Sequence, residues 1–303
     1  MLQPIAVFVL LVIHRSSGRI PASENGTPGS DTSSSQQKNQ TIVAAGYSGA
    51  ATLSVGDTAW TVLSGMKRSR LVGPSLACLN GKIYVMGGNE EGDDSSQTEV
   101  EVYDFSTKHW SMATPLPEPT FSNGGAVYKD GKLYMLGRSN MLIYDITTNS
   151  WSAVDVGLQN GTRFYAFAII AETMYICDLQ VRCWQYDLNT KQQSHMPSMT
   201  KVSYFPSIIA LNGYIYSIGG NDDQFKEVAY AEVYNPSTGS WSVIESMTQK
   251  RDRPALAVMD GKIYAIGGDY YGTTAEIYDP TTNTWINGPG LRDVIASSAA
   301  SCA

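Results

Sequence analysis

The stretch from Leu256 to Trp285, LAVMDGKIYAIGGDYYGTTAEIYDPTTNTW, decides the fold of this chain. It contains three apolar runs rich in β-branched and aromatic residues, and a fourth run begins at Trp285. The runs are separated by Asp-Gly, by Gly-Gly with a polar loop, and by Asp-Pro-Thr-Thr-Asn. Each run is too short for a helix, and each break carries residues that favour turns. The stretch therefore predicts a four-stranded antiparallel meander.

The same unit recurs along the chain, with signature residues at fixed positions in each copy. The second strand carries a tyrosine, at Tyr84, Tyr134, Tyr175, Tyr216 and Tyr264. The third strand ends in a tyrosine followed by Asp or Asn, at Tyr103, Tyr144, Tyr186, Tyr234 and Tyr278. Six residues after that Asp or Asn comes a tryptophan, at Trp110, Trp151, Trp241 and Trp285. A Gly-Gly pair follows the second strand, beginning at Gly87, Gly219 and Gly267.

The third copy departs from this pattern. Gln193 stands where the other copies have the spaced tryptophan, and Trp184 lies three residues before Asp187, so it is not the signature residue. The Gly-Gly pair is replaced by Asp178-Leu179 here and by Gly137-Arg138 in the second copy. We interpret the signature residues as packing and turn residues, and we assign no function to any of them.

The Gly-Gly, the Tyr-Asp and the spaced Trp together resemble kelch repeats, from Thr41 to Ala303. The region is most similar to the propeller half of metazoan kelch-like proteins. This resemblance implies a β-propeller with one blade per repeat. It also implies that partners bind the face formed by the loops between strands two and three and between strand four and the next strand one. The segment before Thr41 is too short to encode the BTB and BACK regions of such proteins.

The two ends of the repeat region complete one blade. Thr41–Met66 resembles strands two to four, with Trp60 six residues after Ser54, and it has no strand one. Val294–Ala303 resembles a strand one with nothing after it. We therefore predict an all-β fold, a six-bladed kelch propeller over residues 41–303 that is closed by this composite blade. Closure leaves no free sheet edge in the ring.

The N-terminal 40 residues differ from the rest. Residues 1–18 resemble a signal peptide, because Ile5–Ile13 is an apolar core too short to span a bilayer and residues 16–18 are small. Residues 19–40 are polar and predict a disordered linker. Glycosylation sequons occur at Asn25, Asn39 and Asn160. We expect a secreted glycoprotein without a membrane span. The alternative is that the N-terminal segment is a mis-assigned start or a disordered leader, in which case the protein is cytoplasmic.

The four cysteines show no metal-binding spacing. Cys177 and Cys183 flank the strand two to three turn of the third blade. Two interpretations stay open for them, a disulfide in an oxidising compartment or two buried thiols. Cys78 and Cys302 fall in strand-one segments, where small buried thiols are common, and we predict no bond between them.

Composition and motifs argue against several classes of function. The net charge is −7 and no long basic run occurs, which disfavours nucleic-acid binding. No catalytic, phosphate-binding or dinucleotide-binding motif is present, and the chain has only three histidines. We therefore predict no enzyme, no catalytic residue, no metal site and no cofactor. A secreted enzyme of the sialic acid mutarotase type, whose relatives are six-bladed kelch proteins, stays as an alternative.

The binding face implied by the resemblance has uneven loops. Blades one and four carry the longest strand two to three loops, and exposed aromatic and arginine side chains are common hot spots of protein interfaces. The candidate partner-binding residues are Tyr204, Phe205, Asn221, Asp222, Asp223, Phe225, Arg251, Arg253, Asp269, Tyr270 and Tyr271.

Some kelch-like proteins use arginines just ahead of strand one to hold acidic peptides. The equivalent positions here are Gly73, Asn123, Phe164, Phe205 and Arg253. Because only one of them is arginine, we expect a protein partner with basic and apolar character. The alternative within the same class is an intracellular substrate-recognition module of a cullin ubiquitin ligase, or an actin-binding kelch protein.

Overall fold

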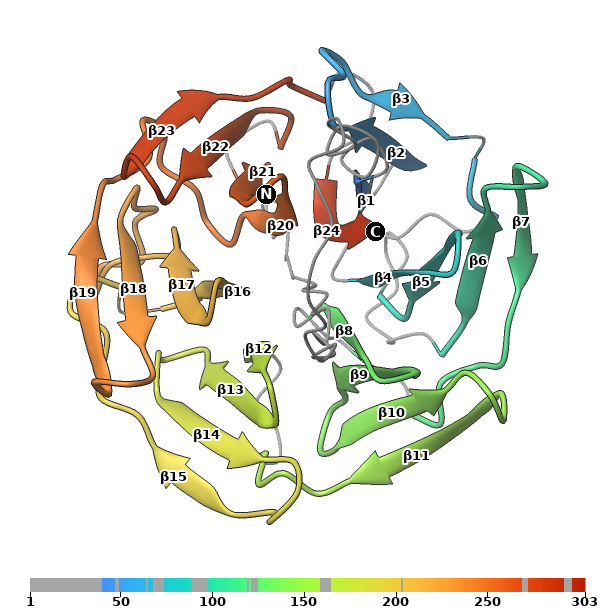
Figure 1. Cartoon of the computed structure of the whole chain (residues 1–303), viewed down its shortest axis with the longest axis horizontal. Coiled ribbons are helices and arrows are strands. Elements are labelled where there is room, and N and C mark those ends of the chain that lie inside the picture. The colour runs from blue at the N-terminus through green and yellow to red at the C-terminus, as the bar shows by residue number, and fades with distance from the viewer. Residues whose placement is uncertain are drawn as a thin grey trace, which may run out of the picture.

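Figure 1 shows a computed structural model of the chain. The structure describes residues 40–46, 49–63, 65–67, 74–88, 98–118, 120, 125–158, 165–202, 204–268, 272–291 and 296–302. Within these residues the chain forms six four-stranded antiparallel sheets arranged as blades of a ring (Figure 1). The predicted signal peptide, the predicted linker up to residue 39 and the asparagines of the three sequons lie outside the described residues.

Blades one to five each contain four consecutive strands. The first three are β4 (Ser75–Leu79), β5 (Lys82–Met86), β6 (Val100–Asp104) and β7 (His109–Met112); β8 (Ala126–Lys129), β9 (Lys132–Leu136), β10 (Met141–Asp145) and β11 (Ser150–Val154); and β12 (Tyr165–Ile170), β13 (Thr173–Asp178), β14 (Cys183–Asp187) and β15 (Gln193–His195). The next two are β16 (Ser207–Leu211), β17 (Tyr214–Ile218), β18 (Ala231–Asn235) and β19 (Ser240–Ile244); and β20 (Ala255–Met259), β21 (Lys262–Ile266), β22 (Ala275–Asp279) and β23 (Thr284–Asn287).

The sixth blade is composite, which confirms the prediction from the two chain ends. Its strands are ordered β24-β1-β2-β3, with bounds β24 (Ala296–Cys302), β1 (Thr41–Gly46), β2 (Gly49–Ser54) and β3 (Thr61–Val62). In β1, Thr41 lies opposite Cys302 of β24 and also opposite Ser54 of β2. The C-terminal strand therefore closes the ring by pairing with the first strand of the repeat region.

The core follows from the position of each strand in its blade. The first strands surround the centre of the ring, and the fourth strands lie on its rim (Figure 1). Ile208, Ile209 and Ala210 of β16 are all buried, whereas β19 contains only exposed and half-buried residues. Strands that are covered on both faces require continuous apolar runs, and rim strands require only alternation. The turns between strands one and two also follow from the sequence. In Asn80-Gly81, for example, both residues have the positive φ that tight hairpin turns require.

Four of the signature tryptophans join their blade to the one before it. The indole of Trp241 packs at a tilt against the ring of Tyr234 in its own blade, with centroids 5.3 Å apart, and its Nε1 donates a hydrogen bond to the carbonyl of Pro197, 3.0 Å away. Trp60, Trp151 and Trp285 make the same kind of bond, to Pro289, Thr114 and Glu245. These residues are structural, as the sequence predicted.

The cysteines form two disulfides. Cys177 and Cys183 face each other across β13 and β14 and are bonded, which is the first of the two interpretations above. Cys78 and Cys302 are also bonded, with their Cα atoms 5.0 Å apart. The prediction of no bond there was wrong, because the first strands of neighbouring blades converge at the centre and β24 lies beside β4 (Figure 1). Within the described residues, no helix could cross a bilayer.

Candidate functional site

The described candidate residues gather at one end of blades four and five. We call this surface the loop face; it comprises Tyr204–Phe205, Asn221–Lys226 and Arg251–Arg253. The first and third segments connect strand four of one blade to strand one of the next, and the second segment lies between β17 and β18. The structure therefore brings the three predicted segments together. Asp269, Tyr270 and Tyr271, which were predicted for the same surface, lie outside the described residues.

The Gly-Gly pair of blade four lets these segments approach one another. Gly220 has φ +102°, and a Cβ atom there would lie 2.7 Å from the carbonyl oxygen of Tyr204. The backbone of Asn221 exchanges two hydrogen bonds with Tyr204, and Gly220 donates one to Arg251. A side chain at Gly220 would push these backbones apart. The Gly-Gly pair thus determines how closely the segments of the loop face pack together.

Two buried glutamates hold the connecting segments from below. Glu232 and Glu276 stand two residues before the strand-three tyrosine of their blades, and both side chains are buried. Glu232 accepts hydrogen bonds from the backbone N–H groups of Thr200 and Lys201, at 2.9 and 2.8 Å. Glu276 does the same for Thr248 and the residue after it. The sequence analysis missed these residues; their signal was a glutamate repeated at one position of strand three.

Arg251 is a structural residue, and its prediction as a partner-binding residue was wrong. Its side chain is 0% exposed. Its guanidinium lies 3.1 Å from a carboxylate oxygen of Glu276 and donates to the carbonyl of Gly267 at 2.7 Å. A buried charge needs a charged partner and satisfied hydrogen bonds. Arg251 therefore fixes the turn between β21 and β22 and is not available to a partner.

Arg253 is buried too, which corrects the expectation of an exposed arginine. Its guanidinium pairs with the carboxylate of Asp252 at 2.6 Å and lies 4.2 Å from the ring centroid of Phe205. Asp252 in turn accepts a hydrogen bond from the side-chain amide of Asn221, which is itself buried. Phe205 and Arg253 occupy equivalent positions of successive blades, each directly before a proline. Between blades four and five, the loop face is thus a cluster of aromatic, arginine and carboxylate side chains that hold one another in place.

Phe225 is the most prominent side chain of the loop face. It is 62% exposed, and its ring stacks on that of Tyr204 with centroids 4.2 Å apart. Asp222 shapes the turn that presents it by accepting backbone hydrogen bonds from Lys226 and Gln224. These bonds, chiefly that from Lys226, lower the pKa of the Asp222 carboxyl. Asp223 is exposed beside it.

Three residues of this face have left-handed backbone conformations. Phe205, Phe225 and Arg253 have φ of +55°, +57° and +47°. Such values are uncommon for bulky residues and persist where surrounding contacts fix them. The hydrogen-bonded segments described above provide those contacts, so the ring of Phe225 is presented by a rigid turn.

Comparison with known proteins agrees with the repeat pattern. The model of the Kelch motif matches residues 70–117, 204–248 and 250–292. These three segments are blades one, four and five, the copies with an intact Gly-Gly pair. The chain is a kelch-repeat propeller.

Related proteins resemble this kelch propeller along much of its length. Kelch-like protein 36 of Mus musculus is 29% identical over 264 residues, which are 80% of this chain and 36% of that protein. Kelch repeat and BTB domain-containing protein 6 of Homo sapiens is 34% identical over 109 residues, 36% of this chain and 16% of that protein. The chain thus spans about a third or less of these relatives. The solved structure of YjhT has a TM-score of 0.67 at 14% identity and covers 82% of this chain and 94% of its own, which shows a shared fold.

Proposed function

We propose that this chain is a non-enzymatic protein-binding propeller that takes its partner on the loop face of blades four and five. The observation that carries the proposal is the exposed ring of Phe225, stacked on Tyr204 and held on a fixed turn. A rigid aromatic side chain beside satisfied polar groups is typical of interface hot spots, because little conformational freedom is lost on binding.

The partner that best suits this face is a protein with an apolar side chain and basic neighbours. Phe225 and Tyr204 offer an apolar contact, and Asp222 and Asp223 lie in the same turn. The net charge of −7 favours encounter with a basic rather than an acidic surface. The buried Arg251 and Arg253 are paired with carboxylates, so they do not form a binding site for an acidic peptide.

The positions of the described histidines support a non-enzymatic role. His109 and His195 lie in β7 and β15, the rim strands of blades one and three (Figure 1). Neither stands at the centre of the ring, where an enzyme of the mutarotase type would require a convergent cluster. The buried ion pair of Arg251 with Glu276 is occupied in holding a connecting segment.

We propose further that the protein is secreted. All four cysteines are in disulfides, and disulfides persist mainly in oxidising compartments. The apolar N-terminal segment and the three sequons fit the same route. An intracellular adaptor, the alternative, would carry reduced cysteines and no glycans. The mature N-terminus, the glycosidase-induced mass shift and the thiol count of the protein from its native compartment distinguish the two.

The binding proposal is tested with a matched pair of exposed aromatic residues in blade four. Phe225 lies on the loop face, and Tyr214, 39% exposed, begins β17 at the opposite end of the blade. Partners are captured with the mature wild-type chain, and the affinity of a captured protein is measured for both variants. We expect Phe225→Ala to weaken binding about tenfold or more and Tyr214→Ala to leave it unchanged. Equal affinity of Phe225→Ala and wild type would remove the loop face as the site.

A further inference from the structure

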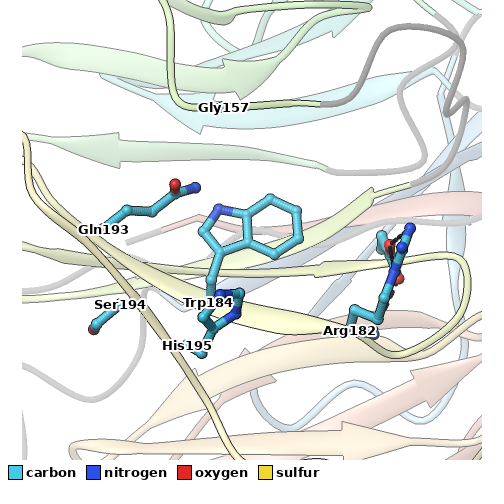
Figure 2. Close-up of a pocket in the computed structure, with 7 residues that line it drawn as sticks. Gly157, Arg182, Trp184, Gln193, Ser194 and His195 are labelled. Carbon is cyan, nitrogen blue, oxygen red and sulfur yellow. Dashed lines mark hydrogen bonds and ion pairs between the residues drawn. The ribbon is translucent and has the colours of Figure 1, made fainter.

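Blade three contains a cavity at the position where other blades hold an indole. Its volume is about 260 Å³, and it lies between blade three and the segment that follows β11 (Figure 2). Among the described residues its lining consists of Gly157, Asp178, Arg182, Trp184, Gln193, Ser194 and His195.

The cavity arises from the loss of the signature tryptophan. Gln193 lies opposite Tyr186 in the same register that places Trp241 opposite Tyr234. Its side-chain nitrogen donates to the carbonyl of Val156 at 3.1 Å, which is the bond that an indole makes to the preceding blade elsewhere. The glutamine therefore keeps the hydrogen bond between blades but fills less space than an indole. The glutamine side chain lies close to Gly157, where a Cβ atom would come within 2.9 Å of its Nε2, and the remaining space lies along Trp184, Ser194 and His195.

A second substitution places an aromatic ring in this space. Trp184 occupies the strand-three position that holds the buried Glu232 and Glu276 in blades four and five. The indole projects from β14 toward Gly157, with Gln193 on one side and Arg182 on the other (Figure 2). It is half-buried and packs against the main core. The rest of the indole lines the cavity together with polar side chains.

The polar groups at one side are fixed by an ion pair. The Asp178 side chain is buried, and its carboxylate accepts hydrogen bonds from the backbone N–H groups of Gln180 and Arg182. It also lies 2.6 Å from the guanidinium of Arg182, whose side chain is 56% exposed. Because the pair carries no net charge, it offers donors and acceptors without a preference for a charged ligand.

We propose that this cavity is a binding site for a neutral pyranose sugar, separate from the loop face. The negative face of an indole attracts the C–H groups of a pyranose ring. The guanidinium of Arg182, the amide of Gln193 and the imidazole of His195 line the same cavity and offer partners for hydroxyl groups. The volume lies just below the range of about 300–1,000 Å³ usual for drug-sized ligands, which suits one sugar ring. The sugar is a free saccharide or a terminal residue of a glycan.

The test uses the intact mature chain and a panel of methyl glycosides of glucose, galactose, mannose, fucose and N-acetylglucosamine. Binding is followed by tryptophan fluorescence and by ligand NMR up to about 20 mM, which detects millimolar dissociation constants. We expect saturable binding of at least one glycoside, insensitive to salt because the ligand is neutral. Trp184→Ala and Gln193→Trp should each weaken it at least about tenfold. Phe225→Ala, on the loop face, should leave it unchanged.

Two variants keep the test decisive. If Trp184→Ala unfolds the blade, Gln193→Trp replaces it in the test. This variant fills the cavity with the residue that the other blades use, so we expect it to fold. Attachment of the same sugars to a bead or to a glycoprotein distinguishes free saccharide from glycan as the natural source. The proposal fails if no glycoside binds, if Gln193→Trp binds as wild type does, or if peptides rather than sugars compete for the cavity. None of these results bears on partner binding at the loop face.

Discussion

Blade three and the composite blade are both held by a disulfide, but the two bonds connect very different parts of the chain. Cys78–Cys302 joins the first strands of neighbouring blades across a sequence separation of 224 residues. Cys177–Cys183 joins two strands of one hairpin, six residues apart. The first bond links the C-terminal strand of the composite blade to blade one. The second reinforces a turn in a blade that has lost its Gly-Gly pair and its tryptophan. Removing each bond in turn would show how far ring closure and local repair differ in their effect on stability.

Removal of the closing disulfide should have the largest effect. In the chain-entropy model the stabilisation grows with the length of the loop, and a loop of this size gives about 5 kcal/mol. The double variant Cys78→Ala/Cys302→Ala should therefore lower the free energy of unfolding by about that amount in denaturant titrations monitored by fluorescence. Since β24 is held to β1 by backbone bonds as well, the variant should still fold. If the free energy of unfolding fell by less than it does on removal of the blade-three disulfide, ring closure would not be the larger contribution to stability.

Removal of the blade-three disulfide should cost less. The same model gives about 2 kcal/mol for a loop of this length. The double variant Cys177→Ala/Cys183→Ala is expected to show this loss, with local hydrogen exchange in β13 and β14 increasing more than elsewhere. The Cys78→Ala/Cys302→Ala variant, measured oxidised and reduced, is the control for the substitutions themselves, because reduction then opens only the blade-three bond. Uniform loss of protection around the ring would mean that this bond, too, acts on closure.

The sequence predicted the fold well because the repeat places each strand. Turn residues, strand periodicity and the spaced tryptophan fixed the blades, and the incomplete halves at Thr41–Met66 and Val294–Ala303 predicted the composite blade. The predicted strand positions also imply the Cys78–Cys302 disulfide, which was not predicted. Cys78 and Cys302 were both placed in first strands of neighbouring blades, and first strands meet at the centre. The position of a single cysteine does not predict a bond, which follows only from the contact between the two strands.

The candidate site was predicted less well, because loop position says little about burial. Arg251 and Arg253 lie in a connecting segment, yet both are buried, Arg251 against Glu276 and Arg253 against Phe205, which precedes the first strand of the preceding blade. The repeated glutamate of strand three was the available signal for Arg251. Phe205 and Arg253 stand at equivalent positions of the repeat, but a contact between the two blades follows only from the three-dimensional arrangement. The stacking of Phe225 on Tyr204 likewise depends on the course of the loop.

The smallest expected effect concerns the position that makes blade three unlike blade four. Gln193→Trp should restore the indole that packs against the strand-three tyrosine in the other blades, here Tyr186, and fill part of the cavity. We expect the free energy of unfolding to rise by about 1 kcal/mol from aromatic contact and cavity filling. The reverse change in blade four, Trp241→Gln, is the matched control and should lower stability.

The same substitution also tests whether the disulfide compensates for the missing tryptophan. If it does, Gln193→Trp should reduce the loss caused by Cys177→Ala/Cys183→Ala, and a double-mutant cycle would give a coupling above about 0.5 kcal/mol. Strictly additive effects would show that the two features of blade three are independent. In that case the hairpin disulfide holds the Asp178–Arg182 turn in place, and the glutamine alone accounts for the cavity.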